Sequence, residues 1–312
     1  MLDRRKFLHQ SVFTAGAFSV SNSLLKKVDE MTAVTRLTIL HTNDTHSRID
    51  PFPMDGGRNQ GMGGVAQRAR LIEQIRMKEE HVLLLDAGDI FQGTPYFNLY
   101  KGEPEIKAMT SMAYDATTIG NHDFDAGLEN LANQLTRHAK FPMLISNYDF
   151  SGTPMEFNYE PYKIFKKGKL KIGVFGVGIE MKGLVPDTLF GQTRYIEPVQ
   201  KANEVAEKLK KDKNCDLVVC LSHLGYQYKD NKVSDEALAK ESGNIDLIIG
   251  GHTHTFLDAP VVYKNKKGQD VIVNQVGFAG IILGRLDFEF SKISRKKLAN
   301  SVVISVTKKT GE

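Results

Sequence analysis

The sequence contains few of the residues that mark disulfide-rich or membrane-spanning proteins. Only two cysteines occur in 312 residues, Cys215 and Cys220, and both belong to one strand-like segment. Five strand steps would place them roughly 16 Å apart, which is too far for a disulfide. We therefore expect two free thiols and a fold that does not depend on an oxidising compartment. No apolar run reaches the ~18 residues of a membrane-spanning helix, so no membrane span is expected.

The excess of positive charge is also small. The net charge is +4, and the basic residues are scattered along the chain, so a nucleic acid polymer is not expected as a partner. We interpret the basic runs at 207–213 and 294–297 as solvated surfaces. A hydrophobic content of 41% and a charged content of 25% are typical of a globular protein with one large domain or two modest ones.

The N-terminal segment differs from the rest of the chain. Residues 1–30 carry the pair Arg4-Arg5, then Phe7-Leu8, a modest apolar stretch and further basic residues. This layout resembles the twin-arginine export signal of bacteria, and the alternative is a basic tail on a cytosolic protein. We expect an export signal over 1–30 and a periplasmic location, although no clear cleavage site is present.

Strand-like apolar runs alternate with helical patterns through the rest of the chain. Strands are expected at 36–42, 81–88, 115–120, 142–147, 216–223 and 245–252, with two more in 158–178. Helices are expected at 64–78, 104–113, 128–139 and 199–212, from apolar residues at helical spacing. The alternation favours an α/β fold with a mostly parallel core, and the hairpin-rich end adds antiparallel strands. In such sheets, ligands bind beyond the carboxyl ends of the strands.

Metal-capable side chains follow five of the expected strands. They are Asp44 and His46, then Asp89, then Asn121 with its neighbours, then His223, and finally His252 and His254. If the strands are parallel, these groups converge at one edge. Nitrogen and oxygen donors without a thiolate suit zinc, manganese, iron or cobalt better than magnesium. About seven donors fit two ions that share a carboxylate, an arrangement that attacks phosphate esters.

The charges of such a site are consistent with an anionic substrate. Two divalent ions bring four positive charges and Asp44 and Asp89 remove two, which favours a hydroxide and a phosphate. Metal-bound water can reach a pKa near ~7, so hydroxide is available at neutral pH. A single His or Asp near a strand end is more often a turn or cap residue than a ligand. On that basis, structural or surface roles are assigned to His9, His41, His81, His138 and Asp123.

Several motifs together resemble those of a known family. They include "LTILHTNDTHSRI", "GDIFQGTP", "GNHDFD", "LSHLG" and "IIGGHTHT". The chain resembles the calcineurin-like metallophosphoesterases over roughly residues 36–290, and more narrowly the catalytic domain of the 5′-nucleotidase family. That family also includes UDP-sugar hydrolases and 2′,3′-cyclic-nucleotide phosphodiesterases. The resemblance implies a four-layer α-β-β-α sandwich over 31–312.

The resemblance also implies roles for individual residues. One ion would be held by Asp44, His46, Asp89 and His254. The other would be held by Asp89, Asn121, His223 and His252, with Asp89 as the bridge. His122 would face the phosphate, stabilise developing charge and protonate the leaving oxygen, while Asp125 would orient His122.

The expected function is that of a dinuclear metal-dependent hydrolase of small phosphate esters, with nucleotides as substrates and a metal-bridging hydroxide as nucleophile. The alternatives are a hydrolase of another ester (a cyclic phosphodiester, a UDP-sugar or a sulfur-containing anion) and a non-catalytic subunit of the same fold. The resemblance further implies a nucleotide-binding domain after the catalytic one. That domain is expected to be absent from this chain, and a separate chain is a possible source of it.

Overall fold

The computed structural model describes residues 34–230, 232–291 and 295–307. The expected export signal at 1–30 lies outside these described residues. Two β-sheets form the centre of the fold, with strand orders β13-β12-β1-β2-β3 and β10-β11-β9-β8-β6-β5. The strands of the first sheet are β1 (Thr35–Thr42), β2 (Val82–Asp86), β3 (Ala116–Thr117), β12 (Ile282–Ser291) and β13 (Arg295–Ser305). Those of the second are β5 (Tyr162–Lys167), β6 (Leu170–Gly178), β8 (Leu217–His223), β9 (Leu247–Gly250), β10 (Val261–Lys264) and β11 (Asp270–Asn274).

The inner strands of both sheets are parallel, as the sequence predicts. β1, β2 and β3 run parallel to one another, and so do β6, β8, β9 and β11. The antiparallel strands lie outside them: β12 and β13 on the first sheet, β5 and β10 on the second. A further antiparallel pair joins β4 (Tyr148–Asp149) to β7 (Arg194–Tyr195).

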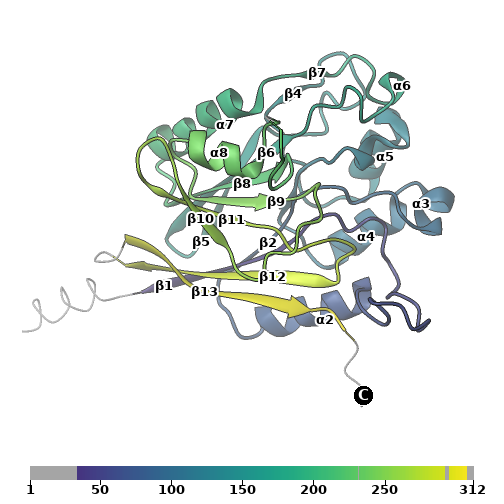
Figure 1. Ribbon diagram of the computed structural model, residues 1–312, viewed down its shortest axis with the longest axis horizontal. Coiled ribbons are helices and arrows are strands. Elements are labelled where there is room, and N and C mark those ends of the chain that lie inside the picture. Colours follow the sequence, from purple (N-terminus) through teal and green to yellow (C-terminus); the bar gives the residue numbers. More distant parts are fainter. Residues whose placement is uncertain (1–33, 231, 292–294, 308–312) are drawn as a thin grey trace, which may run out of the picture.

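The helices cover the outer faces of the two sheets. The first sheet packs on α2 (Val65–Arg76), α4 (Glu103–Ser111) and α5 (Gly127–His138), and the second on α7 (Pro198–Glu207) and α8 (Asp235–Glu241). Figure 1 shows α7 and α8 above β8 and β9, and α2 below β12 and β13. The remaining helical segments are α3 (Pro95–Tyr100), η1 (His122–Phe124), α6 (Asp187–Phe190) and the π-helical η2 (Lys208–Asp212).

Side-chain alternation along the strands explains the layering. In β1, Leu37 and Ile39 enter the core between the sheets, whereas Leu40 enters the core beneath the helices. In β8, Val219 faces the other sheet and Cys220 faces α7 and α8. A strand buried on both faces reads as a continuous apolar run, which is why these strands were predictable. The result is the four-layer α-β-β-α sandwich, and this fold prediction is confirmed.

The prediction about the two cysteines is also confirmed. Cys215 and Cys220 are buried free thiols, as expected. Within the described residues, no helix has the length and apolar character needed to cross a bilayer.

The structure departs most from the predicted strands at 115–120 and at 142–147. Of 115–120, only β3 pairs as a strand, because the chain then turns into the loop that carries Asn121. The predicted strand at 142–147 is wrong: Met143 and Leu144 make single bridges to Thr117 and Glu160. Pro142 has no N–H with which to extend that pairing.

Candidate active site

All nine residues expected at the site lie together at the carboxyl ends of the strands. Asp44 and His46 follow β1, Asp89 follows β2, and Asn121, His122 and Asp125 follow β3. From the second sheet, His223 ends β8, and His252 and His254 follow β9. The site therefore sits where the two sheets meet, and each sheet supplies part of it.

A first group of donors comprises Asp44, His46 and His254, whose ligand atoms lie within 4.8 Å of one another. The Nε2 atoms of His46 and His254 are 2.9 Å apart. Asp44 Oδ1 lies 3.4 Å from His254 Nε2 and 3.9 Å from His46 Nε2. Asp44 is fully buried, whereas the side chain of His254 is 40% exposed, so this group has a buried and an open side.

A second group comprises Asp89, His223 and His252, again within 4.8 Å. Asp89 Oδ2 is 3.1 Å from His223 Nε2 and 3.9 Å from His46 Nε2, so Asp89 lies between the two groups. Asn121 Oδ1 is 2.7 Å from His252 Nδ1, which adds an amide oxygen to this group. The structure therefore brings together the residues that the resemblance assigns to each ion.

The hydrogen bonds of two imidazoles leave a lone pair directed into the site. His46 Nδ1 is 3.2 Å from the carbonyl oxygen of Phe91, and His223 Nδ1 is 2.7 Å from that of Ala87. A carbonyl oxygen only accepts, so each Nδ1 carries the proton and the neutral ring has its lone pair on Nε2. Metal-binding histidines are oriented in this way. An Nε2 lone pair and a nearby carboxylate oxygen repel each other. A cation bound between the nitrogen and the oxygen removes that repulsion.

The electrostatics of the site favour a bound cation. Burial opposes ionisation of Asp89, but His223 and His46 hold the pKa of this carboxyl below its usual range. Burial alone would lower the pKa of His223, yet the carboxylates of Asp89 and Asp44 raise it to about 10. Without an ion, His223 Nε2 therefore carries a proton that offsets the carboxylates, and a metal ion that binds there would displace this proton and leave the ring neutral. Burial, with the nearby charge of His223, lowers the pKa of His252 to about 4, which leaves that ring neutral, as a metal ligand must be.

The backbone is strained at most of the proposed ligands. Five of them have positive φ: 50° at Asp44, 47° at His46, 54° at Asp89, 71° at His252 and 51° at His254. Each such residue costs of order 1–3 kcal/mol, and strain of this kind collects at functional sites. The surrounding structure must therefore hold these turns in place.

His122 lies at the same opening but belongs to neither donor group. Its Nδ1 is 2.9 Å from Asp125 Oδ2, and its ring centroid is 5.4 Å from that of His46. The hydrogen bond to Asp125 raises the pKa of His122, and burial opposes that rise. The side chain of His122 is 42% exposed, so it can contact a substrate that enters this opening.

Two buried carboxyl groups behind the ligands were not singled out from the sequence. Asp86 accepts hydrogen bonds from Thr42 Oγ1 at 2.5 Å and from the N–H of Gly88 at 2.9 Å. Asp123 was expected to have a structural or surface role, and it has the structural one: it is only 1% exposed and accepts from four backbone N–H groups. Burial raises the pKa of Asp123 to about 7, with a further rise from the charge of Asp89, and the N–H groups of Gly120 and Phe91 oppose it.

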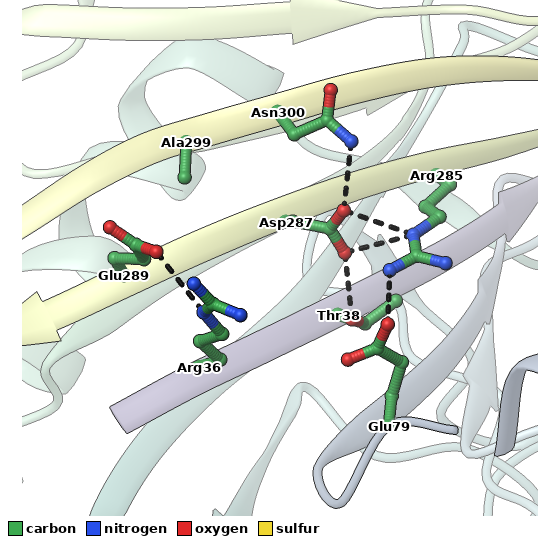
Figure 2. A pocket seen from close by; sticks show the side chains of 8 residues that line it. All are labelled: Arg36, Thr38, Glu79, Arg285, Asp287, Glu289, Ala299 and Asn300. Carbon is green, nitrogen blue, oxygen red and sulfur yellow. Dashed lines mark hydrogen bonds and ion pairs between the residues drawn. The ribbon is translucent and has the colours of Figure 1, made fainter. Parts of the chain in front are cut away.

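Figure 2 shows a different pocket, on the outer face of the first sheet near the start of β1. Its charged side chains are paired with one another. Arg285 Nε is 3.0 Å from both carboxylate oxygens of Asp287, and Arg36 Nε is 3.1 Å from Glu289 Oε1. Because these arginines already have carboxylate partners, this pocket is a surface ion-pair network and not a second anion site.

Comparison with known proteins gives the same assignment as the geometry. A sequence model of the calcineurin-like phosphoesterase family matches residues 37–256, which include every proposed site residue. The snake venom 5′-nucleotidase of Crotalus adamanteus is 35% identical over 274 residues, which cover 81% of this chain and 45% of the relative. The 5′-nucleotidase of Vibrio cholerae is 36% identical over 279 residues, with 82% and 49% covered.

A solved structure is also similar. The 5′-nucleotidase precursor from Thermus thermophilus superposes with a TM-score of 0.78 at 30% identity, over 88% of this chain and 55% of that one. The chain thus spans about half the length of these relatives. The match over most of the chain, together with the two donor groups, decides the family. The chain belongs to the calcineurin-like phosphoesterases, a family of metal-dependent hydrolases.

Proposed function

We propose that this chain hydrolyses small phosphate monoesters, with 5′-nucleotides as its substrate class. The observation that carries the proposal is the pair of donor groups with Asp89 between them and His122 beside them. The family uses a dinuclear centre of divalent metal ions. The names of the curated relatives support the nucleotide class.

Each ion would bind one of the two groups of donors that lie close together. We assign Asp44, His46 and His254 to one ion, and Asn121, His223 and His252 to the other, with Asp89 shared. Bound divalent ions would hold the phosphate oxygens, offset their charge and activate water at neutral pH. Buried Asp44 and Asp89 would fix the ions in place, and the more exposed His254 would border the substrate.

His122 would act on the substrate and not on the ions. Its raised pKa, which comes from the hydrogen bond to Asp125, keeps more of the ring protonated near neutral pH. A protonated imidazole stabilises charge on the phosphate and can donate a proton to the leaving oxygen. Asp125 would hold the ring in the orientation that directs Nε2 toward the substrate, as a carboxylate does in other acid–base pairs.

The test is a substrate screen on the purified chain reloaded with Mn²⁺, Zn²⁺ or Co²⁺. It compares nucleoside monophosphates with cyclic nucleotides, UDP-sugars and an aryl phosphate, each with and without a chelator. We expect metal-dependent release of phosphate from nucleoside monophosphates. If a cyclic nucleotide or a UDP-sugar is hydrolysed faster than the nucleoside monophosphates, the proposed substrate class is wrong. No turnover of any ester by protein that holds two ions would contradict the proposal as a whole.

We further propose that the protein is exported by the twin-arginine route. The proposal rests on Arg4-Arg5, spaced from Phe7-Leu8 as in such signals. Replacing both arginines by lysine should retain folded protein in the cytoplasm of a bacterial host that has this pathway. Cell fractionation measures the distribution, and unchanged export of the variant would argue against the route.

A further inference from the structure

We propose that Asp123 is a positioning residue that holds the main chain of the metal site around Asp89. The inference rests on the proposed function, because Asp89 is assigned there as the ligand shared by both ions. Asp123 lies in η1, next to His122, and is almost fully buried. Its carboxylate points away from solvent and into the loop that follows β2.

Four backbone N–H groups donate to this one carboxylate. Oδ1 accepts from Ile90 at 2.9 Å and from Phe91 at 3.1 Å. Oδ2 accepts from Asp89 at 3.1 Å and from Gly120 at 2.8 Å. A carboxylate offers about four lone-pair sites, so its capacity is filled by the main chain. Although burial opposes ionisation, four N–H donors on four lone pairs require the ionised form, and hydrogen bonds to an ionised acceptor are roughly twice as strong as neutral ones.

The two loops hold each other by exchanged carboxylates. Asp123, from the loop after β3, accepts from the N–H of Asp89 after β2. In return, Asp89 Oδ1 accepts from the N–H of His122 at 2.8 Å. This exchange fixes the position of Asp89 relative to Asn121 and His122, the two proposed site residues on the other loop.

The conformation of Asp89 requires such support. Its φ of 54° lies in the left-handed region, where a non-glycine residue persists only if its surroundings determine it. The N–H groups of Asp89 and of the next two residues all donate to Asp123. Without these acceptors, the loop would lose both its conformation and its hydrogen-bond partners. Asp123 therefore acts on the ions through Asp89.

The decisive experiment titrates Mn²⁺ into metal-free Asp123→Asn protein by calorimetry. The amide nitrogen cannot accept and would face N–H donors, so the loop around Asp89 should rearrange. We expect at least one Mn²⁺ to bind roughly 10–100-fold more weakly than in the unaltered chain, the usual effect of removing such a supporting partner. Turnover lost at limiting Mn²⁺ should return in part at excess Mn²⁺, as weakened metal binding requires, and the affinity measured on folded protein separates this effect from a general loss of stability.

Asp246→Asn is the control. Asp246 is a second carboxylate that accepts a backbone N–H, although it also pairs with Lys210 and Lys296. Asp246 Oδ2 also accepts a backbone N–H, that of Val218 at 2.8 Å, but at the amino end of β8, away from the site. This variant should lose stability and keep the Mn²⁺ affinity of the unaltered chain. If Asp123→Asn, while folded, binds both ions within about threefold of that affinity, the positioning role is wrong.

Hydrogen exchange of the unaltered chain tests the inference if Asp123→Asn does not fold. The amides of residues 89–91 and of Gly120 should be protected, although they lie in loops. Exchange at the rate of exposed loops would overturn the inference.

The two proposals fail separately: an unaltered chain that binds Mn²⁺ but cleaves no ester contradicts the proposed function alone. An active chain with unaffected Asp123→Asn contradicts only the positioning role.

Discussion

His122 and Asp89 occupy neighbouring positions at the site but should fail in different ways when they are replaced. His122→Ala should retain both ions, because His122 belongs to neither donor group, and should lose roughly 10²–10⁴-fold in kcat if the ring acts as a general acid. Asp89→Ala should lose bound metal as well as rate. Metal analysis of both variants beside their kcat separates the two roles. A metal-free His122→Ala protein would show that the ring holds an ion.

His41 should make the protein sensitive to acid. It is fully buried, with Nε2 3.0 Å from Asn274 Nδ2, and burial lowers its pKa to about 3. In the unfolded chain the pKa is about 6.5, so below that pH the unfolded state binds the proton and the folded state does not. The free energy of unfolding should then fall by about 1.4 kcal/mol per pH unit from about pH 6.5 toward pH 3.

The measurement for His41 is urea unfolding at pH 7, 6 and 5 in a chelator, for the unaltered chain and His41→Gln. The difference at pH 7 gives the packing cost of the substitution. That difference should shrink at pH 6 and again at pH 5, because only the unaltered chain carries the histidine penalty. Parallel pH curves for the two proteins would mean that His41 is charged in the folded state.

The reach of sequence reasoning at this scale depends on where the partners of a residue lie. Asp44, Asp89 and His223 could be predicted to lie at the site, since each lies at or within a few residues of the end of an apolar strand. Asp123 could not be predicted in its role. Its partners are backbone N–H groups up to 34 residues away, and a main-chain donor leaves no mark in the sequence.

Among the loops that follow the strands, the turn after β2 should tolerate little change at Gly88. Gly88 has a φ of 86°, and a Cβ there would lie 2.7 Å from the nitrogen of Gly120 and 2.9 Å from the carbonyl carbon of Ile119. Gly88→Ala should therefore separate the loops after β2 and β3. We expect lost metal binding and a destabilisation well above the ~1 kcal/mol scale of compatible glycine substitutions.

Gly183→Ala is the control for this prediction. Gly183 has nearly the same φ, 85°, but a Cβ there meets nothing within 4 Å. Gly183→Ala should be destabilised only by the unfavourable positive φ of an alanine at this position, and it should keep its ions. Metal content and denaturant unfolding of both variants test the comparison. Equal losses in the two variants would show that crowding at Gly88 is unimportant.

Single elements were predictable where local pattern decides them. The amphipathic spacing in α2 and the apolar run of β8 gave nearly the observed bounds. The segment 142–147 is apolar enough for a strand, but it lies between Thr117 and Glu160 with one bridge to each. A strand exists only where a neighbour supplies a ladder, and that neighbour is not visible in the segment itself.

Across the whole molecule, the pairing of distant strands was beyond prediction from residues alone. β1 pairs with β12, Thr35 opposite Phe290, so the two ends of the described chain complete one sheet. Alternating strands and helices indicated a parallel core but not its division into two sheets, which came from the family resemblance. This division matters for the site, because the proposed metal ligands come from two separate sheets.

The proposed ions should bind the two layers together. Each donor group takes members from both sheets: Asp44 and His46 with His254 in one, Asp89 with His223 and His252 in the other. Metal that binds only the folded state stabilises it by RT ln(1 + [L]/Kd), about 2.7 kcal/mol at a free concentration 100-fold above Kd. For a chain of this size, that corresponds to a rise in Tm of roughly 4 °C.

Thermal unfolding of the unaltered chain in Mn²⁺ and in a chelator measures this stabilisation by bound metal. Asp89→Ala is the control. The control lacks the shared carboxylate, so Mn²⁺ should raise its Tm much less. An equal rise in both proteins would place the stabilising ions elsewhere on the surface. No rise in the unaltered chain would mean that its ions bind too weakly to couple the sheets. The predicted pattern is a rise in Tm that depends on Asp89. Such a pattern requires ions that bind between the two sheets, because Asp89 is the carboxylate that lies between the two donor groups.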